Sequence, residues 1–217
     1  MPVGQGRNAA GVADIKLGRH GAQLVAAHQG KYAERALEGK LYWTSSVVAG
    51  LAIPIDTTTA PTVMLWNPSG SGVDAVLGRF TASQASGTSA GGSIGLMSVS
   101  AEKLGSEQAT AARITAFADD AYGTNVFSGR LNEGNRPRVK SSSQGTNTIT
   151  AGTWIRAFGM YFGAAIATSA GNSLVLNHDF DGEVVLPPGS AVYIAANIAS
   201  VALFQTTFSW YEVPATL

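Results

Sequence analysis

The clearest pattern in this chain is a regular alternation of residue types in its last segment, 201–213. Phe204, Thr206, Phe208 and Trp210 occupy one set of alternate positions, and Gln205, Thr207, Ser209 and Tyr211 occupy the other. A period of two over about a dozen residues, rich in aromatic and β-branched side chains, is typical of a strand with one buried face. Upstream, residues 179–197 read as two short strands joined by a Pro-Pro-Gly corner, so the end of the chain predicts an antiparallel sheet.

Similar apolar runs predict further strands along the chain. These runs cover residues 22–28, 42–48, 62–66, 73–81, 94–100, 153–162 and 172–177. The turn signal at 67–72 predicts a hairpin between the third and fourth runs. Residues 31–40 predict one or two helical turns, whereas 102–118 fits a helix by its alanine content or a strand over 110–117.

Two other stretches are predicted to be loops, because most of their residues are small or polar. Residues 84–93 are rich in Ser, Gly and Ala, and residues 129–147 combine basic residues with a Ser-Ser-Ser-Gln-Gly run. Long loops of the second kind in compact domains are often functional. The alternation of the strand at 153–162 would place Trp154, Phe158, Met160 and Phe162 on one face.

Together the runs amount to roughly eight to ten strands with turn signals between them, the number expected for a two-sheet jelly roll or a related sandwich. The fold class predicted is all-β: an antiparallel, jelly-roll-like sandwich with at most one or two short helices. Residues 1–30 are expected to be an extended N-terminal arm, because 1–21 holds five glycines and no aromatic residue. Residues 31–217 are expected to form a single sandwich domain.

Composition points toward assembly rather than a free monomer. Charged residues make up 13% of the 217 residues, about half the usual share, while hydrophobic residues make up 45%. A free monomer generally carries more charge for solubility, so the surface is expected to pack against other protein. With a net charge of zero, no global field attracts nucleic acid or an anionic membrane.

The chain has no cysteine, which excludes disulfides and thiolate metal sites. It also has no apolar run of membrane-spanning length and no apolar core of signal-peptide type near the start. We therefore expect a soluble protein made without a secretory signal, with no contact to membrane or nucleic acid.

Residues 182–189, GEVVLPPG, are similar to the second motif of cupins, in which a metal-binding histidine follows. Here Val192 stands at the position of that histidine, and an apolar side chain cannot coordinate a metal. His178 lies upstream, while His20 and His28 are in the N-terminal region. The motif is therefore interpreted as a strand-reversing corner, and no cofactor or metal is expected.

Asp179, Asp181 and Glu183 could offer oxygen ligands to Ca²⁺, but carboxylates on a solvated strand edge are the commoner case and the one we favour. Nothing in the sequence supports a catalytic Ser–His–acid set, since there are three histidines and no Gly-x-Ser-x-Gly elbow. No phosphate-binding Gly-x-x-x-x-Gly-Lys loop is present either. The sequence therefore predicts no catalytic residue.

The stretch 129–147 carries the candidate assembly contacts, which are Arg130, Arg136, Arg138 and Lys140. Glu133 lies among them and no aromatic residue is interleaved, so the group is a weak nucleic-acid site. A solvated loop is one interpretation, and contact with an acidic surface of a neighbouring subunit is the functional one. The four tryptophans, Trp43, Trp66, Trp154 and Trp210, fit core positions better than a sugar-binding platform.

Several short motifs together resemble the β-sandwich structural proteins of tailed bacteriophages and related prophages. They are GKYAERALEGK at 30–40, VMLWNPSGSG at 63–72, WIRAFG at 154–159, and the ending from GEVVLPPG at 182–189 to FSWYE at 208–212. The resemblance follows a glycine-rich N-terminus and covers most of residues 30–213. It implies a non-enzymatic virion component, commonly trimeric, and transfers no catalytic residue.

The first functional hypothesis is a phage capsid decoration (cement) protein or a head–tail accessory protein. It would self-associate, dock on the major capsid protein or another virion protein, and reside in the virion and in the host cytoplasm during assembly. The second hypothesis is a receptor- or glycan-binding spike module, which requires one tryptophan to lie open in a groove. A cupin-like or carbohydrate-cleaving enzyme is the third and would need a metal or a convergent acid pair.

Overall fold

The computed structural model describes residues 5–8, 11–14, 32–88, 91–100, 107–131, 135–143, 147–150, 152–161, 165–166 and 175–215. The chain divides into two compact units, Met1–Glu34 and Arg35–Leu217. In the first unit, β1 (Gln5–Asn8) and β2 (Gly11–Asp14) pair as an antiparallel hairpin. The strand expected at 22–28 lies outside the described residues. The helical turns expected at 31–40 are present as α1 (Ala33–Leu37).

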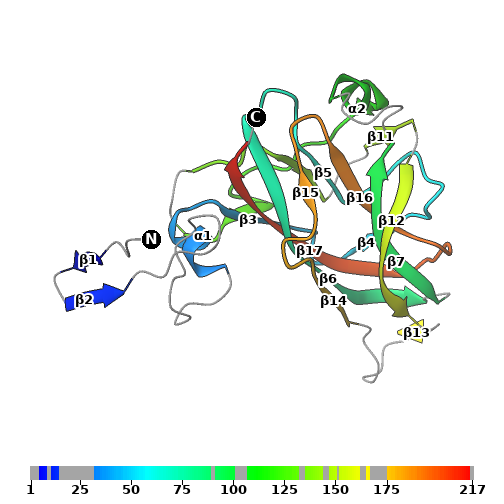
Figure 1. Cartoon of the computed structure of the whole chain (residues 1–217). Coiled ribbons are helices and arrows are strands. Elements are labelled where there is room, and N and C mark those ends of the chain that lie inside the picture. Colours follow the sequence, from blue (N-terminus) through cyan, green and yellow to red (C-terminus); the bar gives the residue numbers. More distant parts are fainter. Residues whose placement is uncertain are drawn as a thin grey trace. The chain divides into compact units, whose positions relative to one another are not determined.

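The larger sheet of the second unit is built around two long strands, β6 (Val73–Thr88) and β17 (Leu203–Pro214); β17 pairs from end to end with residues 73–86 of β6 (Figure 1). The sheet continues from β17 through β3 (Leu41–Ser45) to β9 (Val126–Ser128). The free side of β6 pairs in turn with β15 (Val185–Leu186), β14 (Val175–Asp179) and β13 (Ala165–Ile166), and β4 (Leu51–Ala52) pairs with the start of β17. All of these pairings are antiparallel.

The smaller sheet has five antiparallel strands. Their order is β10 (Lys140–Ser142), β5 (Met64–Trp66), β16 (Ala191–Ala196), β7 (Gly92–Val99) and β12 (Gly152–Tyr161). A short ladder of β8 (Ile114–Ala116) with β11 (Thr148–Ile149) follows α2 (Glu107–Arg113). Two main sheets, with only two short helices among the described residues, confirm the all-β sandwich.

The core between the two sheets is largely aromatic. Phe80, Phe180, Phe208 and Trp210 are completely buried there, together with Leu65, Leu77, Ile94 and Leu96. The predicted alternation of β17 is confirmed, because Phe204, Thr206, Phe208 and Trp210 are buried while the intervening side chains are not. This alternation lets the larger sheet cover the core with one face and present the other to solvent.

A second apolar cluster lies on the opposite face of the smaller sheet. Strand β16 is buried at every position, with Val192 and Ile194 in the main core and Tyr193 and Ala195 in the second cluster. Residues from β8 and its flank, Ile114 and Phe117, pack against this cluster. The smaller sheet is therefore covered on both faces, which explains why its strands read as continuous apolar runs.

Four local expectations differ from the structure. The turn at 67–72 joins no hairpin, because β5 belongs to the smaller sheet and β6 to the larger. Asn67 directs this crossing: its buried amide donates to the carbonyls of Val73 at 2.7 Å and Leu186 at 2.8 Å. The loop expected at 84–93 is mostly strand, since β6 continues to Thr88 and β7 begins at Gly92.

The single face expected for 153–162 is also wrong, because two register shifts interrupt β12. Trp154 packs against the second cluster and Phe158 against the main core. The loop expected at 129–147 contains β10, whose Ser141 and Ser142 are buried. The ambiguous stretch 102–118 contains both alternatives in succession, the helix α2 and then the strand β8.

Candidate functional site

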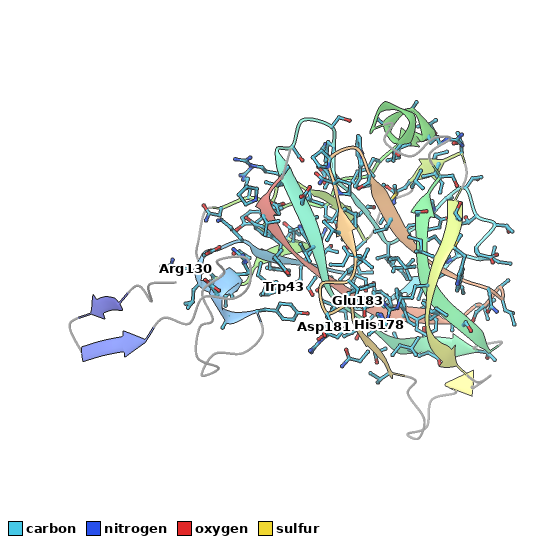
Figure 2. The ribbon with its side chains drawn as sticks, in the orientation of Figure 1. Trp43, Arg130, His178, Asp181 and Glu183 are labelled. Atoms are coloured by element: carbon cyan, nitrogen blue, oxygen red, sulfur yellow. The ribbon has the colours of Figure 1, made fainter. Side chains whose placement is uncertain are left out.

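The structure divides the four candidate assembly contacts into two places. Arg136 and Arg138 precede β10 and Lys140 begins it, so these three share one short segment, residues 135–140, called the basic ridge below. Arg130 follows β9 instead and donates from its guanidinium to the carbonyl of Leu37 at 3.1 Å. Figure 2 shows Arg130 on the α1 side of the sandwich, where it lines a separate hollow of about 210 Å³.

The basic ridge separates two open hollows of about 500 Å³ each. Lys40, Asn135 and the buried Glu212 line the first hollow, whereas Asp119, Asp120 and Tyr122 line the second. Arg136 and Arg138 border both hollows. A partner that rests on the ridge can therefore reach these two guanidinium groups from either side.

The three cations of the ridge differ in how far their charge is already satisfied. Lys140 lies 3.5 Å from the carboxylate of Asp119 and 5.9 Å from the ring centre of Trp66. Arg138 donates from its guanidinium to the carbonyl of Ser71 at 3.2 Å. Arg136 is exposed and has no hydrogen bond or ion pair to any residue within the described ranges. Arg136 is therefore the cation of the ridge that is available to a partner.

A buried carboxylate holds the ridge from below. Glu212 continues the inward-facing set of β17, two residues beyond Trp210, and its Oε1 accepts the backbone N–H groups of Arg138 at 2.8 Å and Val139 at 2.9 Å. Burial raises the pKa of the Glu212 carboxyl, against the lowering effect of these two hydrogen bonds. Residues 138–139 are thus fixed to the central strand of the larger sheet.

A second carboxylate fixes the residues just beyond the ridge. Asp120 accepts hydrogen bonds from the hydroxyl of Thr44 at 2.5 Å, the hydroxyl of Ser141 at 3.2 Å and the backbone N–H of Ser143 at 3.1 Å. Burial raises the pKa of Asp120, and the hydrogen bond from Thr44 is the largest opposing effect. Hydrogen-bonded carboxylates consequently hold residues 138–139 of the ridge and residues 141–143 just beyond it.

The acidic cluster proposed from the sequence does not converge. Asp179 lies 3.5 Å from the guanidinium of Arg79, whereas Glu183 pairs with Arg156. Asp181 lies in the turn between them with a positive φ of 53°, and Figure 2 shows it on the same side as His178 and Glu183. In the part of the chain that the structure describes, no group of three or more His, Cys, Asp or Glu residues is placed to hold a metal ion.

His178 and Val192, the residues singled out beside the cupin-like corner, both have apolar surroundings. The ring of His178 stacks on Phe158, with 4.7 Å between ring centres, and meets Phe180 edge-on at 4.9 Å. Burial, followed by the nearby Arg156, lowers the pKa of His178. Val192 is buried in the main core, so the corner at 182–189 serves the packing of the sandwich. His20 and His28 lie outside the described residues.

The tryptophans divide between core and partial exposure. Trp210 is fully buried, and Trp66 and Trp154 pack against the second apolar cluster. Trp43 lies on the outer face of β3, since its neighbours Tyr42 and Thr44 are the buried ones, and its ring stacks on Phe127 at 6.2 Å. Trp43, labelled in Figure 2, is therefore the tryptophan that belongs to an exterior sheet surface.

Sequence reasoning found the basic group but missed both of the carboxylates that hold it. Glu212 was detectable, because the period of two in β17 places it on the same face as Phe208 and Trp210. Asp120 had no such signal: its partners Thr44 and Ser143 are far away in the sequence. No family model, curated protein or solved structure matches this chain. No helix within the described ranges is long and apolar enough to cross a membrane.

Proposed function

We propose that this chain is a non-enzymatic structural protein of a tailed bacteriophage particle. It acts as a capsid decoration protein or a head–tail accessory protein that associates with copies of itself, with a trimer as the expected form. It docks on the major capsid protein or another virion protein. The observation that carries this proposal is the basic ridge, which presents Arg136, a cation with no partner among the described residues, two positions before a segment that a buried carboxylate holds.

A rigid surface suits docking on a shell, because no binding free energy is then lost in ordering a loop. The carboxylates of Glu212 and Asp120 hold residues 138–143 by backbone and hydroxyl hydrogen bonds before any partner arrives. A surface held in its bound conformation loses less conformational entropy on association. The ridge therefore suits recognition by a preformed surface.

The chemistry of Arg136 suits a carboxylate. A guanidinium group presents a planar set of donors that matches a carboxylate in bidentate geometry. The other residues of the ridge are Asn135, Pro137 and Val139 with the two partnered cations, so no aromatic residue of the ridge itself offers a stacking surface to a nucleic-acid base. An acidic protein surface is the partner that fits this arrangement.

On a lattice of identical sites, a weak contact at each site would be sufficient for stable docking. A surface ion pair contributes little alone, roughly 0–1 kcal/mol. An oligomer that engages several such sites on a repeating shell gains avidity without any new kind of contact. This arithmetic favours a decoration or accessory protein over a protein that binds a single soluble partner.

The test is co-sedimentation of the purified chain with particles from a strain that lacks it. We expect wild-type chain to bind, with an affinity that falls as salt is raised, because salt screens exposed charges. Arg136→Glu should weaken binding by about tenfold or more, since it places like charges across the interface. Lys140→Gln is the matched control and should change binding by less than about threefold, because Lys140 is already partnered.

Mass spectrometry of wild-type particles provides the second readout. The chain should be found in purified virions in a fixed ratio to the major capsid protein. Its absence from virions would refute the proposed function. Unchanged binding of Arg136→Glu would refute the role of the ridge.

Trp43 is the observation that favours the alternative, a receptor- or glycan-binding module. It stacks on Phe127 at an outer sheet face, next to the hydroxyl groups of Ser45 and Thr207, which lie 3.5 Å apart. Titration with glycans while tryptophan fluorescence is recorded separates the two functions. Quenching in wild-type chain that disappears in Trp43→Phe would establish the glycan function, and an unchanged signal would exclude Trp43 as a glycan platform.

A further inference from the structure

At one end of the sandwich, the described segments carry no charged side chain. There β6 ends at Thr88, β7 begins at Gly92 and β17 begins at Leu203. The described segments that meet at this end include 46–52, 86–88, 91–93 and 197–204, called the uncharged end below. None of them contains Asp, Glu, Lys or Arg. The nearby charge is Asp56, whose backbone N–H donates to the carbonyl of Ala196 at 2.8 Å.

These segments are tied to one another, so the uncharged end is a defined surface. Leu51 and Ala52 pair with the start of β17, and the side-chain amide of Gln205 donates to the carbonyl of Val48. Asn197 accepts the N–H of Ser93 at 2.7 Å, and the hydroxyl of Ser200 donates to the carbonyl of Thr88 at 3.3 Å.

A glycine permits one of these close approaches. Gly87 has a φ of 81°, and a Cβ at this position would lie 2.7 Å from the carbonyl oxygen of Val201. Any other residue would clash with that backbone oxygen and would also be strained at this φ. The backbone that presents Val201 is therefore packed directly on β6.

The same end exposes large apolar side chains. Val48 is 85% exposed and Val201 is 76% exposed, while Ile198 and Val47 are exposed to 45% and 40%. Scattered single apolar residues on a surface are ordinary. Here four of them lie on interlocked segments that carry no charge, and Ser46, Asn197 and Ser200 on the same segments supply polar groups.

We infer that the uncharged end is the surface through which copies of this chain associate around a rotation axis. In a cyclic assembly, residues close to the axis meet the same residues of the other copies. Any charge there faces a like charge, so a surface near the axis must be free of unpaired charge. The uncharged end meets this requirement, because its segments contain no Asp, Glu, Lys or Arg. A second copy offers a matching apolar, uncharged surface.

The location of the uncharged end also leaves the basic ridge accessible. Val73, at one end of β6, lines a hollow of the ridge, whereas Thr88, at the other, belongs to the uncharged end. Strand β6 has 16 residues, so these ends lie up to about 50 Å apart at about 3.3 Å per residue. Copies joined at the uncharged end would therefore present their ridges outward, as docking on a shell requires. This inference rests on the proposed self-association.

The first test measures oligomeric state by sedimentation and light scattering over a range of concentrations. We expect Val48→Asp with Val201→Asp to raise the dissociation constant by roughly 100-fold or more, because each copy would bring unpaired charge to the contact. Val185→Asp is the matched control: Val185 is 47% exposed on β15 and should leave association unchanged. Equal association of the double variant and the wild type would overturn the inference.

The second test uses the absence of native cysteine in the chain. Val201→Cys introduces a single thiol, which can form a disulfide only with another copy. We expect oxidation to give a covalent dimer of Val201→Cys at least about tenfold faster than of Val185→Cys, because association raises the effective thiol concentration. Equal rates for the two variants would contradict the inference even if either substitution altered stability.

The outcomes separate this inference from the proposed function. If the wild-type chain associates and the control and test variants behave alike, the self-association surface lies elsewhere and the virion function stands. If the wild-type chain stays monomeric at all concentrations and is absent from particles, the proposed function fails as well. A chain that stays monomeric but is present in particles would overturn the inference alone.

Discussion

The two ends of the sandwich present opposite chemistry, although the same pair of long strands, β6 and β17, connects them. At one end the basic ridge gathers three cations above a buried carboxylate, Glu212. At the other, the segments around Val48 and Val201 carry no charge and are joined through backbone contacts and neutral side chains. The two ends thus differ in the interactions that stabilise them as well as in the chemistry of their surfaces. Ionisable groups fix the ridge, and strand pairing with neutral hydrogen bonds fixes the uncharged end.

The largest expected difference between the ends is in stability. Glu212→Ala leaves the N–H groups of Arg138 and Val139 without their acceptor, so the free energy of unfolding should fall by about 2–3 kcal/mol. Val48→Ala, at the uncharged end, should change it by less than about 0.5 kcal/mol in the monomer, because Val48 is exposed. Urea denaturation of both variants measures the comparison.

Glu212→Gln is the informative control for that experiment. Glutamine retains a side-chain oxygen that can accept the same two N–H groups, so its loss of stability should be well below that of the alanine variant. Equal losses for the two substitutions would show that the hydrogen bonds do not hold the ridge. If neither Glu212→Ala nor Glu212→Gln changed the free energy of unfolding, the expected difference in stability between the two ends would be disproved.

The next effect is a dependence of stability on pH that arises at the ridge end. Burial raises the pKa of Glu212 and of Asp120 in the folded protein, so the folded state binds these two protons more tightly than the unfolded state. The stability that they contribute is complete at pH values below the ordinary carboxyl pKa. This stabilising contribution is lost as the pH rises through the raised pKa values of the two carboxyl groups in the folded protein. Glu212→Gln should flatten this fall, measured as the free energy of unfolding across the acidic range.

Val201→Ser is the matched variant for the pH experiment. It changes an exposed apolar residue at the uncharged end and adds no titrating group, so its pH profile should be parallel to that of the wild type. A flattened profile in Val201→Ser, or an unaltered profile in Glu212→Gln, would disprove the assignment of the pH dependence to the ridge end.

The smallest expected effect concerns Arg136 itself. Because its side chain has no partner within the described residues, Arg136→Ala should alter the free energy of unfolding by less than about 0.5 kcal/mol. Arg138→Ala should cost slightly more, since Arg138 donates to the carbonyl of Ser71. Thermal unfolding of the two variants checks the order, and a larger loss for Arg136→Ala would show that it has a structural partner.

The sequence predicted those features that depend on local periodicity. The alternation in β17 identified its buried face correctly, because the extra residues at the two register shifts of its pairing lie on β6 and leave β17 itself with a strict period of two. In β12 the same argument failed, since two register shifts move Trp154 and Phe158 to different clusters. Register shifts of this kind leave no signature in the residue types themselves.

Features that depend on distant partners could not be predicted. The segment 67–72 has the composition of a hairpin turn, but the hydrogen bond from the Asn67 amide to the carbonyl of Leu186 joins it to a strand more than a hundred residues away. Likewise, Ser141 to Ser143 read as an exposed loop, yet they are buried beside Asp120. The basic ridge was therefore found by composition, whereas its support emerged only from the tertiary contacts.

The position of β17 has a consequence for how the chain is made. This strand lies between β6 and β3 in the larger sheet and supplies Phe208 and Trp210 to the core, but it is translated after all the other described strands. Until β17 leaves the ribosome, the strand that lies between β6 and β3 is missing, so these two strands are not connected within the sheet. The pairing of Tyr42 with Trp210 spans most of the chain. Folding dominated by such remote pairings is slow and leaves apolar strand surface uncovered in the meantime. Nascent chains of this protein are thus expected to engage cellular chaperones before their folding is complete.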